Sequence, residues 1–424
     1  MADLRTDFVG IKSPNPFWLA SAPPTDKYYN VERAFRAGWG GVVWKTVGEP
    51  IVNVTSRYGA VEHNGSRMAG FTNIELISDR PIDVNLREVK QIKREWPDRA
   101  LVVSLMVPCD EESWKTILAD VEDTGADGIE LNFGCPHGMS ERGMGSAVGQ
   151  VPDYVEMVTA WCKKHTRMPV IVKLTPNITD IRYPARAARK GNADAVSLIN
   201  TLASVIGVDL DTMAPLPLVN GKGTHGGYCG PAVKPVALRM VGDLARDPEC
   251  RGMGISGIGG ISTWRDAAEY LSIGADNVQV CTAAMHRGFK IVEDMIDGLS
   301  NWMDEKGYRA LSDFQGAAVR NYVEWGELDM NYEIVARIDQ DLCIKCGLCH
   351  VTCEDTSHQS IAALRVDGER RYEVIDEECV GCNLCMYVCP VDGCITMEPV
   401  DNGKPYVVWA DDPRNPANRA QAAE

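Results

Sequence analysis

The sequence predicts an α/β protein in which a barrel of eight parallel strands is followed by a small α+β unit rich in cysteine. Short β-branched runs alternate with amphipathic helical stretches up to about residue 310, which is the pattern of a parallel sheet. These runs number eight. Beyond residue 340, eight of the 15 cysteines fall in two copies of one spacing. The chain is therefore expected to contain a large βα part and a small cysteine part.

The candidate strands of the βα part are short and apolar, and several are followed by turn signals and helix-like segments. Eight βα units in about 300 residues fit a TIM (β/α)8 barrel, with insertions between the second and third strands and after the sixth. A doubly wound sheet is the alternative. The strands are expected at residues 17–20, 41–46, 101–106, 128–133, 170–175, 195–200, 254–258 and 278–282, and helices at 152–164, 234–246, 264–273 and 289–302.

The two cysteine runs are Cys343-x2-Cys346-x2-Cys349-x3-Cys353 and Cys379-x2-Cys382-x2-Cys385-x3-Cys389. This spacing is typical of a two-cluster bacterial ferredoxin, in which the fourth cysteine of each run ligates the other 4Fe-4S cluster. Two zinc sites are the alternative, but four cysteines per run in a duplicated rhythm disfavour them. Pro390 follows the second run and Glu354 the first, so the local turns can differ. We assign Cys343, Cys346, Cys349 and Cys389 to one cluster, and Cys379, Cys382, Cys385 and Cys353 to the other.

These patterns set the expected domain boundaries. A catalytic barrel is expected over residues 1–310 and a linker packed on it over 311–335. The ferredoxin-like α+β domain follows over 336–400, and the Pro/Asn/Ala-rich end, 401–424, is expected to be a loosely held tail.

Composition excludes several classes of function. The net charge of -16 argues against nucleic-acid binding, which needs a basic surface. No apolar run reaches the roughly 18–20 residues of a spanning helix, and the first residues lack a signal or transit pattern, so we expect a cytoplasmic protein. Residues 336–400 carry 12 acidic and 5 basic side chains. This acidic segment could steer a basic redox partner, although solubility alone is an equally good explanation.

Unusual residues stand where the barrel strands are expected to end, which is the face that holds the active site in this fold. The second strand ends at Lys45-Thr46, the fifth holds Lys173, and the sixth ends at Asn200-Thr201. An unpaired buried lysine is costly, so two of them suggest an anion or the edge of a flavin ring. A lysine that reaches solvent would be the simpler explanation for either one alone.

Residues 252–257 match the pattern GxGxxG, but we reject a dinucleotide-binding turn. That turn opens a helix early in a βαβ unit, whereas these glycines lie in and after the seventh strand. In a barrel the loops after strands seven and eight bind phosphate through backbone N–H groups. Gly259, Gly260, Cys281 and Thr282 are thus candidates for the phosphate of flavin mononucleotide, with purely structural glycines as the alternative.

Cys135 lies in a glycine-rich polar loop after the fourth strand. This context favours a reactive or acid/base thiol over a core cysteine. His137, two residues on, is expected to orient the loop. The remaining cysteines show no partner pattern and are interpreted as structural: Cys109, Cys162, Cys229, Cys250 and Cys394.

Three segments carry a resemblance to a known family. Residues 132–150, which begin Asn-Phe-Gly-Cys-Pro-His-Gly-Met, together with 73–78 and Asn200-Thr201, closely resemble the dihydropyrimidine dehydrogenases. The resemblance covers about residues 8–400 and is strongest to the bacterial iron–sulfur and flavin subunit of the NAD-dependent enzyme. Dihydroorotate dehydrogenases share the barrel and the Pro-Asn-Pro-Phe start at 14–17, but lack the long run around Cys135 and a fused ferredoxin module of this kind.

The resemblance implies roles for individual residues. Cys135 matches the acid/base cysteine that protonates C5 of uracil or thymine while the reduced flavin gives hydride to C6. Cys229 stands where a small hydroxyl residue is usual, which weakens that position only. The residues that match pyrimidine contacts are Asn73, Glu75, Asn132, Asn200 and Thr201. Those that match FMN contacts are Ser21, Ala22, Lys45, Thr46, Lys173, Gly230, Ile258, Gly259, Gly260, Cys281 and Thr282.

The resemblance also implies a partner. Single-chain members carry an N-terminal domain for FAD and nicotinamide, whereas this sequence starts at the barrel. We therefore expect a separate FAD/NAD-binding flavoprotein subunit that oxidises NADH and docks near the clusters, in a homo- or hetero-oligomer. Electrons would pass from its flavin through the clusters and FMN to the pyrimidine. A dihydroorotate dehydrogenase-type flavoenzyme and a non-catalytic iron–sulfur electron carrier are the alternatives.

Overall fold

The computed structural model describes residues 2–63 and 65–421, which divide after Tyr322 into a larger N-terminal unit and a smaller C-terminal unit. In the N-terminal unit, eight parallel strands close into a barrel in the order β10-β15-β16-β3-β4-β7-β8-β9. The predicted barrel is confirmed, and closure of the sheet rules out the doubly wound alternative. Its strands are β3 (Phe17–Leu19), β4 (Gly41–Val47), β7 (Ala100–Leu105), β8 (Gly128–Asn132), β9 (Val170–Lys173), β10 (Ala195–Leu198), β15 (Gly254–Ile258) and β16 (Asn277–Val280).

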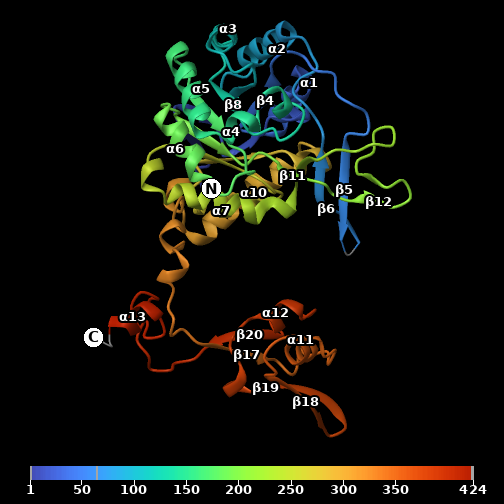
Figure 1. The fold of residues 1–424 in the computed structure, drawn as a ribbon, viewed down its shortest axis with the longest axis vertical. Coiled ribbons are helices and arrows are strands. Elements are labelled where there is room, and N and C mark those ends of the chain that lie inside the picture. Colours follow the sequence, from blue (N-terminus) through green and yellow to red (C-terminus); the bar gives the residue numbers. More distant parts are fainter. Residues whose placement is uncertain (1, 64, 422–424) are drawn as a thin grey trace. The chain divides into compact units, whose positions relative to one another are not determined.

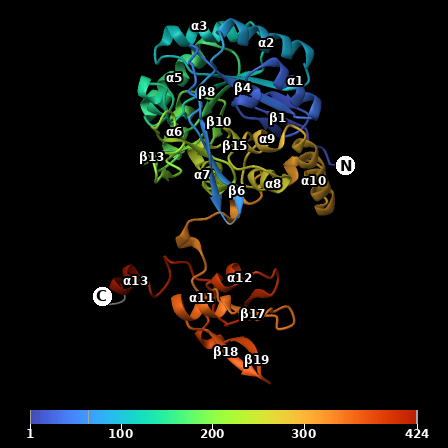
Figure 2. The same cartoon turned by 90° about the vertical axis from the view of Figure 1, so that its right-hand side faces the viewer.

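Helices surround the barrel, as Figures 1 and 2 show. Each buries one stripe of apolar residues against the strands, because both faces of a parallel sheet must be covered. Two helix starts have side-chain caps: Asp110 accepts from Ser113 N, and Thr263 and Asp266 form a capping box. The helices are α1 (Tyr28–Ala37), α2 (Ile82–Glu95), α3 (Glu111–Glu122), α4 (Ser146–Gly149), α5 (Pro152–His165), α6 (Arg182–Lys190), α7 (Lys234–Ala245), α8 (Trp264–Ser272), α9 (Thr282–Arg287) and α10 (Ile291–Lys306).

The inside of the barrel changes from apolar to polar along the strands. At the N-terminal ends, Phe8 and Ile11 of a short hairpin, β1 (Thr6–Phe8) and β2 (Ile11–Ser13), pack on Trp18 and close the barrel. Nearer the C-terminal ends, the interior side chains include Glu130 and Gln279, both almost fully buried. Polar groups inside a barrel are costly unless they are paired, so this end is where a site is expected.

Two insertions build a second sheet beside the barrel, and Figure 1 shows β5, β6, β11 and β12 extending from one side of it. The sheet order is β11-β14-β6-β5, with antiparallel pairing throughout. The expected insertions after the second and sixth strands therefore come together, although they lie far apart in sequence. The strands are β5 (Tyr58–His63), β6 (Ser66–Asn73), β11 (Leu202–Ser204) and β14 (Gly226–Cys229), and a small pair, β12 (Val208–Asp209) and β13 (Ala214–Pro215), lies between the last two in sequence.

The C-terminal unit contains two antiparallel strand pairs and two helices that begin within the cysteine runs. β17 (Ile334–Ile338) pairs with β20 (Ile395–Pro399), and β18 (Ile361–Val366) pairs with β19 (Glu369–Val374). The helices are α11 (Leu348–Thr356) and α12 (Leu384–Val388), and a third, α13 (Pro416–Gln421), lies near the C-terminus.

The helices that follow the two cysteine runs differ in length. α12 ends before Cys389-Pro390, because a residue that precedes proline avoids helical geometry and proline cannot donate to the helix. α11 continues past Cys353 through Glu354 to Thr356. The change from proline to glutamate in the sequence therefore corresponds to an extra helical segment.

The C-terminal segment differs from the loosely held tail that the composition suggests. The backbone N–H of Met330 donates to Val407 O at 2.8 Å, and that of Trp409 donates to Gly326 O at 3.0 Å. The Trp409 ring also packs on Trp325, with 5.8 Å between centroids. Pairing with residues 325–333 supplies the hydrogen bonds that composition alone does not reveal.

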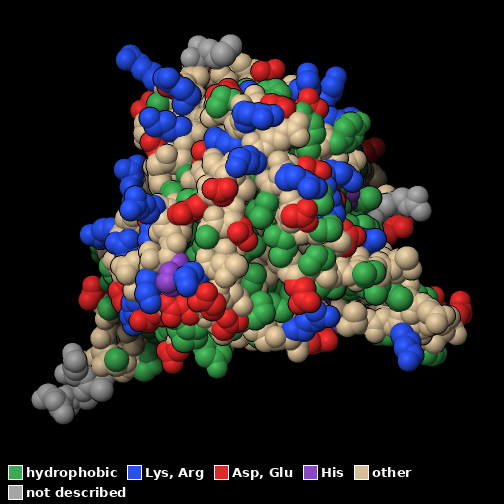
Figure 3. All heavy atoms as spheres, turned by 90° about the horizontal axis from the view of Figure 1, so that it is seen from above, with side chains coloured by type: hydrophobic (Ala, Val, Ile, Leu, Met, Phe, Trp, Pro, Cys, Tyr) green, Lys and Arg blue, Asp and Glu red, His purple; other side chains and the backbone are tan. Residues whose placement is uncertain are grey.

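The surface charge and the hydropathy of the helices agree with the expectations of no large basic surface and no membrane-spanning helix. Figure 3 shows basic and acidic side chains mixed over the face seen from above. Within the part of the chain that the structure describes, no helix is both long enough and apolar enough to cross a membrane.

Candidate active site

One pocket opens at the C-terminal ends of the barrel strands, and all 17 residues predicted for catalysis, pyrimidine binding and FMN binding line it. It encloses about 1170 Å³ of empty space, open solvent at the mouth included. Most of these residues stand at the last position of a barrel strand or just after it. The exceptions, among them Asn73 and Glu75, come from the insertions, whose sheet forms one wall of the pocket.

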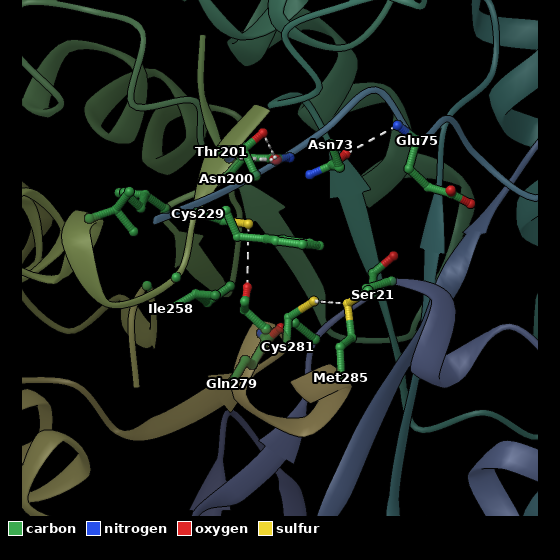
Figure 4. Close-up of a pocket in the computed structure, with 18 of the residues that line it drawn as sticks. Ser21, Asn73, Glu75, Asn200, Thr201, Cys229, Ile258, Gln279, Cys281 and Met285 are labelled. Atoms are coloured by element: carbon green, nitrogen blue, oxygen red, sulfur yellow. Dashed lines mark hydrogen bonds between the residues drawn. The ribbon is translucent and has the colours of Figure 1, made fainter. Parts of the chain in front are cut away.

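Amides and hydroxyls gather at one end of the pocket; Figure 4 shows Asn73, Asn200 and Thr201 there, opposite Cys281 and Met285. Asn200 Nδ2 donates to Asn132 Oδ1 at 3.1 Å. Asn132 Nδ2 in turn donates to the Thr46 hydroxyl at 2.9 Å. This network fixes the amide groups while leaving donors and acceptors for a planar ligand with N–H and C=O groups.

Both carboxylate oxygens of Glu75 are paired in the pocket. Its Oε1 accepts from Lys45 Nζ at 2.6 Å, and its Oε2 accepts from Arg57 at 3.0 Å and from the Tyr58 hydroxyl at 3.1 Å. Burial by itself raises the pKa of Glu75, but Lys45 and Arg57 together lower it below the ordinary value. The carboxylate is therefore charged at neutral pH and holds Lys45 in place.

Lys173 differs from Lys45. Its side chain is only 6% exposed, and its Nζ lies 3.6 Å from Glu130 Oε1, beyond hydrogen-bond distance. Among the described residues its ammonium has no hydrogen-bond acceptor. A buried cation with free donors that lines a pocket fits a ligand with acceptor atoms, such as the polar edge of a flavin ring.

The loop after β15 fits the phosphate of such a ligand. Gly259 has φ +138° and Gly260 has φ +71°, a backbone conformation that favours glycine. A Cβ at these positions would lie 2.7 Å from Ala237 Cβ and 2.8 Å from Lys234 Cβ, so the loop packs directly on α7. Only glycine permits this close approach, and it leaves main-chain N–H groups free of side-chain bulk at the pocket edge.

Cys135 is 9% exposed and packs among Ile77, Met106 and Met139. Burial raises the pKa of its thiol to about 11, although the backbone of His137 and the charge of Lys173 oppose the shift. The thiol donates to His137 O at 3.4 Å. Cys135 is therefore a neutral proton donor at physiological pH.

His137 connects the cysteine loop to the insertion. Its Nε2 lies 3.1 Å from Glu75 O, and burial lowers the pKa of the imidazole. The contact ties the segment that follows β6 to the loop after β8. This arrangement agrees with the expectation that His137 orients the loop.

The sequence analysis missed several pocket residues. Tyr58 and Phe71 stack at 5.5 Å in the insertion sheet, and no local pattern indicated that their rings would reach the pocket. Gln279 also lines the pocket, whereas Glu130 lies next to Lys173 without lining it. Both stand inside predicted strands, where a polar residue is as unexpected as the lysines were. As with Lys45, the cost of burying an unpaired polar group inside a strand would have marked both residues.

Two cavities in the C-terminal unit are lined by the two predicted sets of cysteines. One, of about 310 Å³, is lined by Cys343, Cys346, Cys349 and Cys389, and the other, of about 360 Å³, by Cys353, Cys379, Cys382 and Cys385. Each set takes three thiols from one run and the fourth from the other. These residues fit two four-iron clusters with crossed fourth ligands.

Within the described residues, no three or more His, Cys, Asp or Glu side chains are arranged to hold a single metal ion. Zinc would need four ligands at about 2.3 Å from one centre. The spread of the thiols around larger cavities favours clusters over zinc. Cys394, interpreted as structural, lines the first cavity as a fifth cysteine, and its thiol lies 3.7 Å from Asp339 O.

Comparison with known proteins agrees with both units. The family model "Dihydroorotate dehydrogenase" matches residues 3–303, and the model "4Fe-4S dicluster domain" matches 336–397. The "NAD-dependent dihydropyrimidine dehydrogenase subunit PreA" of Escherichia coli (strain K12) is 42% identical over 399 residues, which cover 94% of this chain and 96% of that protein. The chain belongs to the dihydropyrimidine dehydrogenase family. It is accordingly an oxidoreductase of the iron–sulfur type with a flavoenzyme barrel.

Other relatives match about three quarters of this chain. The "Dihydropyrimidine dehydrogenase (NADP(+)), chloroplastic" of Arabidopsis thaliana is 40% identical over 77% of this chain and 79% of that protein. The catalytic subunit of "Dihydroorotate dehydrogenase B (NAD(+))" of Pyrococcus abyssi is 36% identical over 75% of this chain and 99% of that protein. Ligand-free dihydroorotate dehydrogenase from Eimeria tenella superposes with a TM-score of 0.62 at 20% identity over 75% of this chain and 92% of that one, which shows the shared fold.

Proposed function

We propose that the chain is the catalytic subunit of an NAD-dependent dihydropyrimidine dehydrogenase, which interconverts uracil or thymine and the 5,6-dihydro compound. One observation carries this proposal: the buried, protonated thiol of Cys135 lies in the same pocket as a cluster of asparagine amides. The name of the Escherichia coli relative, a dihydropyrimidine dehydrogenase subunit, supports the same proposal.

The amide end of the pocket suits a pyrimidine. A uracil ring alternates N–H donors with C=O acceptors, and Asn73, Asn132 and Asn200 offer both kinds of group. Thr201 adds a hydroxyl beside Asn200, whose Oδ1 accepts from Thr201 N at 2.8 Å. These side chains would hold the ring by its amide edges, so that its face is presented to the rest of the pocket.

Cys135 would act as the general acid. Its thiol gives its proton to C5 of the pyrimidine, and the resulting thiolate regains a proton from solvent before the next turnover. The high pKa of the thiol keeps the donor protonated at neutral pH, and the nearby charge of Lys173 stabilises the thiolate that forms. In the reverse direction the thiolate would accept the C5 proton.

The pocket residues that would hold FMN are Lys173 at the ring edge and Gly259 and Gly260 at the phosphate. When bound, FMN would exchange hydride with C6 of the pyrimidine, and the clusters would supply it with single electrons. The two cysteine-lined cavities support this electron route. NADH oxidation would belong to a partner flavoprotein that contains FAD, because PreA is named as a subunit.

An assay of the purified chain tests the proposal. Uracil and thymine should be reduced with NADH when a nicotinamide-oxidising flavoprotein partner is added, and by an artificial electron donor without it. Full activity with NADH alone would rule out the two-subunit arrangement. Turnover of orotate in place of uracil would favour a dihydroorotate dehydrogenase activity, and an absorption spectrum without flavin would favour an electron carrier.

A further inference from the structure

A second buried ion pair lies below the pocket, inside the barrel. Glu130 of β8 is 0% exposed and does not line the pocket, yet its Oε1 lies 3.6 Å from the Lys173 ammonium. Three neighbouring strands contribute to its surroundings. The Ser197 hydroxyl of β10 donates to Glu130 Oε2 at 2.7 Å, and Gln279 Nε2 of β16 lies 3.5 Å from the same oxygen and 3.0 Å from Ser256 Oγ of β15.

The two lysine–glutamate pairs of the site are built differently. Both oxygens of Glu75 are occupied by Lys45, Arg57 and Tyr58, and Lys45 is drawn to 2.6 Å. Glu130 Oε1 has no hydrogen-bond partner among the described residues, and neither has Gln279 Oε1. Lys173 is thus attracted by Glu130 without being bound by it, and its N–H donors remain available to the pocket.

Two thiols on the elements around Lys173 interact electrostatically with it. Cys135 follows β8 and Cys281 follows β16, and burial raises the pKa of both thiols, to about 11 and about 12. Both are neutral at physiological pH. Glu130 is therefore the anion that balances the Lys173 charge from within the barrel.

We propose that Glu130 is a positioning residue that holds the Lys173 ammonium directed into the pocket and offsets part of its charge, and thereby sets the reduction potential of the bound flavin. This inference rests on the proposed function, because it needs a flavin at Lys173. An uncompensated lysine stabilises the negative charge that a flavin gains on reduction, and a carboxylate behind it weakens that effect. Glu130 would thus tune a cofactor that it does not touch.

The Glu130→Gln variant tests this, since it removes the charge while keeping the shape and an acceptor for Ser197. Its flavin midpoint potential should rise by about 30 mV, which is a tenfold change in the oxidised-to-reduced ratio of a two-electron couple. In a Lys173→Met background the same substitution should give a much smaller shift, because Glu130 acts through Lys173. Glu130→Asp, which keeps the charge, should restore most of the original potential.

Glu111→Gln is the matched control, because it removes a carboxylate from an ion pair with Lys164 on the barrel surface. Its potential should equal that of the original chain. If the original chain binds flavin and reduces pyrimidine but Glu130→Gln leaves the potential unchanged, the inference is overturned and the proposed function stands. If the purified chain binds no flavin, both are overturned.

A milder variant tests the same inference if Glu130→Gln does not fold. Ser197→Ala removes only the 2.7 Å hydrogen bond that stabilises the charged carboxylate. It should also raise the flavin midpoint potential, by an amount that corresponds to less than a tenfold change in the oxidised-to-reduced ratio. An unchanged or lowered potential in this variant, with flavin bound, would count against the role of Glu130.

Discussion

The barrel pocket and the cysteine-lined cavities hold their functional groups by different means. In the pocket, side chains are fixed by one another: the Thr46 hydroxyl lies 3.1 Å from that of Ser21 and 3.0 Å from that of Ser104, and accepts from Asn132 at 2.9 Å. In the C-terminal unit, the thiols are themselves part of the small core, which includes Cys349 and Cys385. The pocket is therefore built by the protein, whereas the cavities depend on what the thiols bind.

Unit size explains this difference. The barrel has a large continuous core behind its pocket. The C-terminal unit spans residues 323–424, and much of its core is cysteine. Small domains with little apolar core commonly need a metal to fold, so the two regions should respond differently to iron and to mutation.

Iron removal should have the largest effect, and it should separate the two regions. Because structural metal contributes about 10 kcal/mol or more to the folding of small metal domains, the chelated C-terminal unit should unfold while the barrel keeps its structure. Limited proteolysis with mass spectrometry should then give a stable fragment that ends near Tyr322. Equal resistance of both units without iron would contradict the comparison.

Cys135→Ala should lower pyrimidine turnover by about 10²–10⁴-fold, the usual contribution of a positioned general acid. Flavin and iron content and thermal stability should stay close to those of the original chain. Steady-state kinetics with uracil measures the loss. Cys109→Ala removes an exposed thiol away from the pocket and serves as the control, with turnover expected within about twofold.

Glu75→Gln should cost about 3 kcal/mol of unfolding free energy, since it leaves Lys45 and Arg57 without a counter-charge in a buried site. Because pairing lowers the pKa of Glu75 below 4.5, its stabilisation is present above that pH and is lost as the pH falls through the folded-state value. The difference in urea midpoint between variant and original chain should therefore shrink below about pH 4.5. Glu305→Gln, on the exposed face of α10, is the control.

The smallest expected effect is that of pH on kcat for pyrimidine reduction. With a Cys135 pKa of about 11, the acid form persists across the neutral range, so kcat for pyrimidine reduction should be flat from about pH 6 to 9. It should fall only as the pH approaches the pKa of the thiol. A descending limb centred near pH 8.5, the value of an ordinary thiol, and absent from Cys135→Ser, would show that the pocket does not shift this group.

The sequence predicted the barrel well because each strand carries its own local signal. All eight predicted strands begin within one residue of the observed start, and β15 (Gly254–Ile258) has the predicted bounds. The predicted ends of β9, β10 and β16 were two residues too long, since the chain leaves the ladder before Asn200 and Thr282, which line the pocket. The sheet made from two insertions was not predicted, because its pairing joins distant segments. The β1–β2 hairpin was not predicted either, because each of its strands is only three residues long.

For the site, local signals again identified the residues at strand ends. Lys45, Lys173 and Cys135 are conspicuous in sequence because a charge or a thiol stands in an unusual place. Tyr58, Phe71 and Tyr228 reach the pocket through the insertion sheet and carry no such mark. Their roles follow from pairing between β6 and β14, which lie about 150 residues apart.

The sequence by itself determined the eight βα units, the two cysteine runs and the residues that end each strand, because these depend on spacing and local periodicity. Only the tertiary structure decided that two insertions form one wall of the pocket, that Glu75 has three partners, and that Lys173 keeps its donors free above Glu130. Those features depend on distances between groups remote in the chain, and such distances are set by packing and barrel closure.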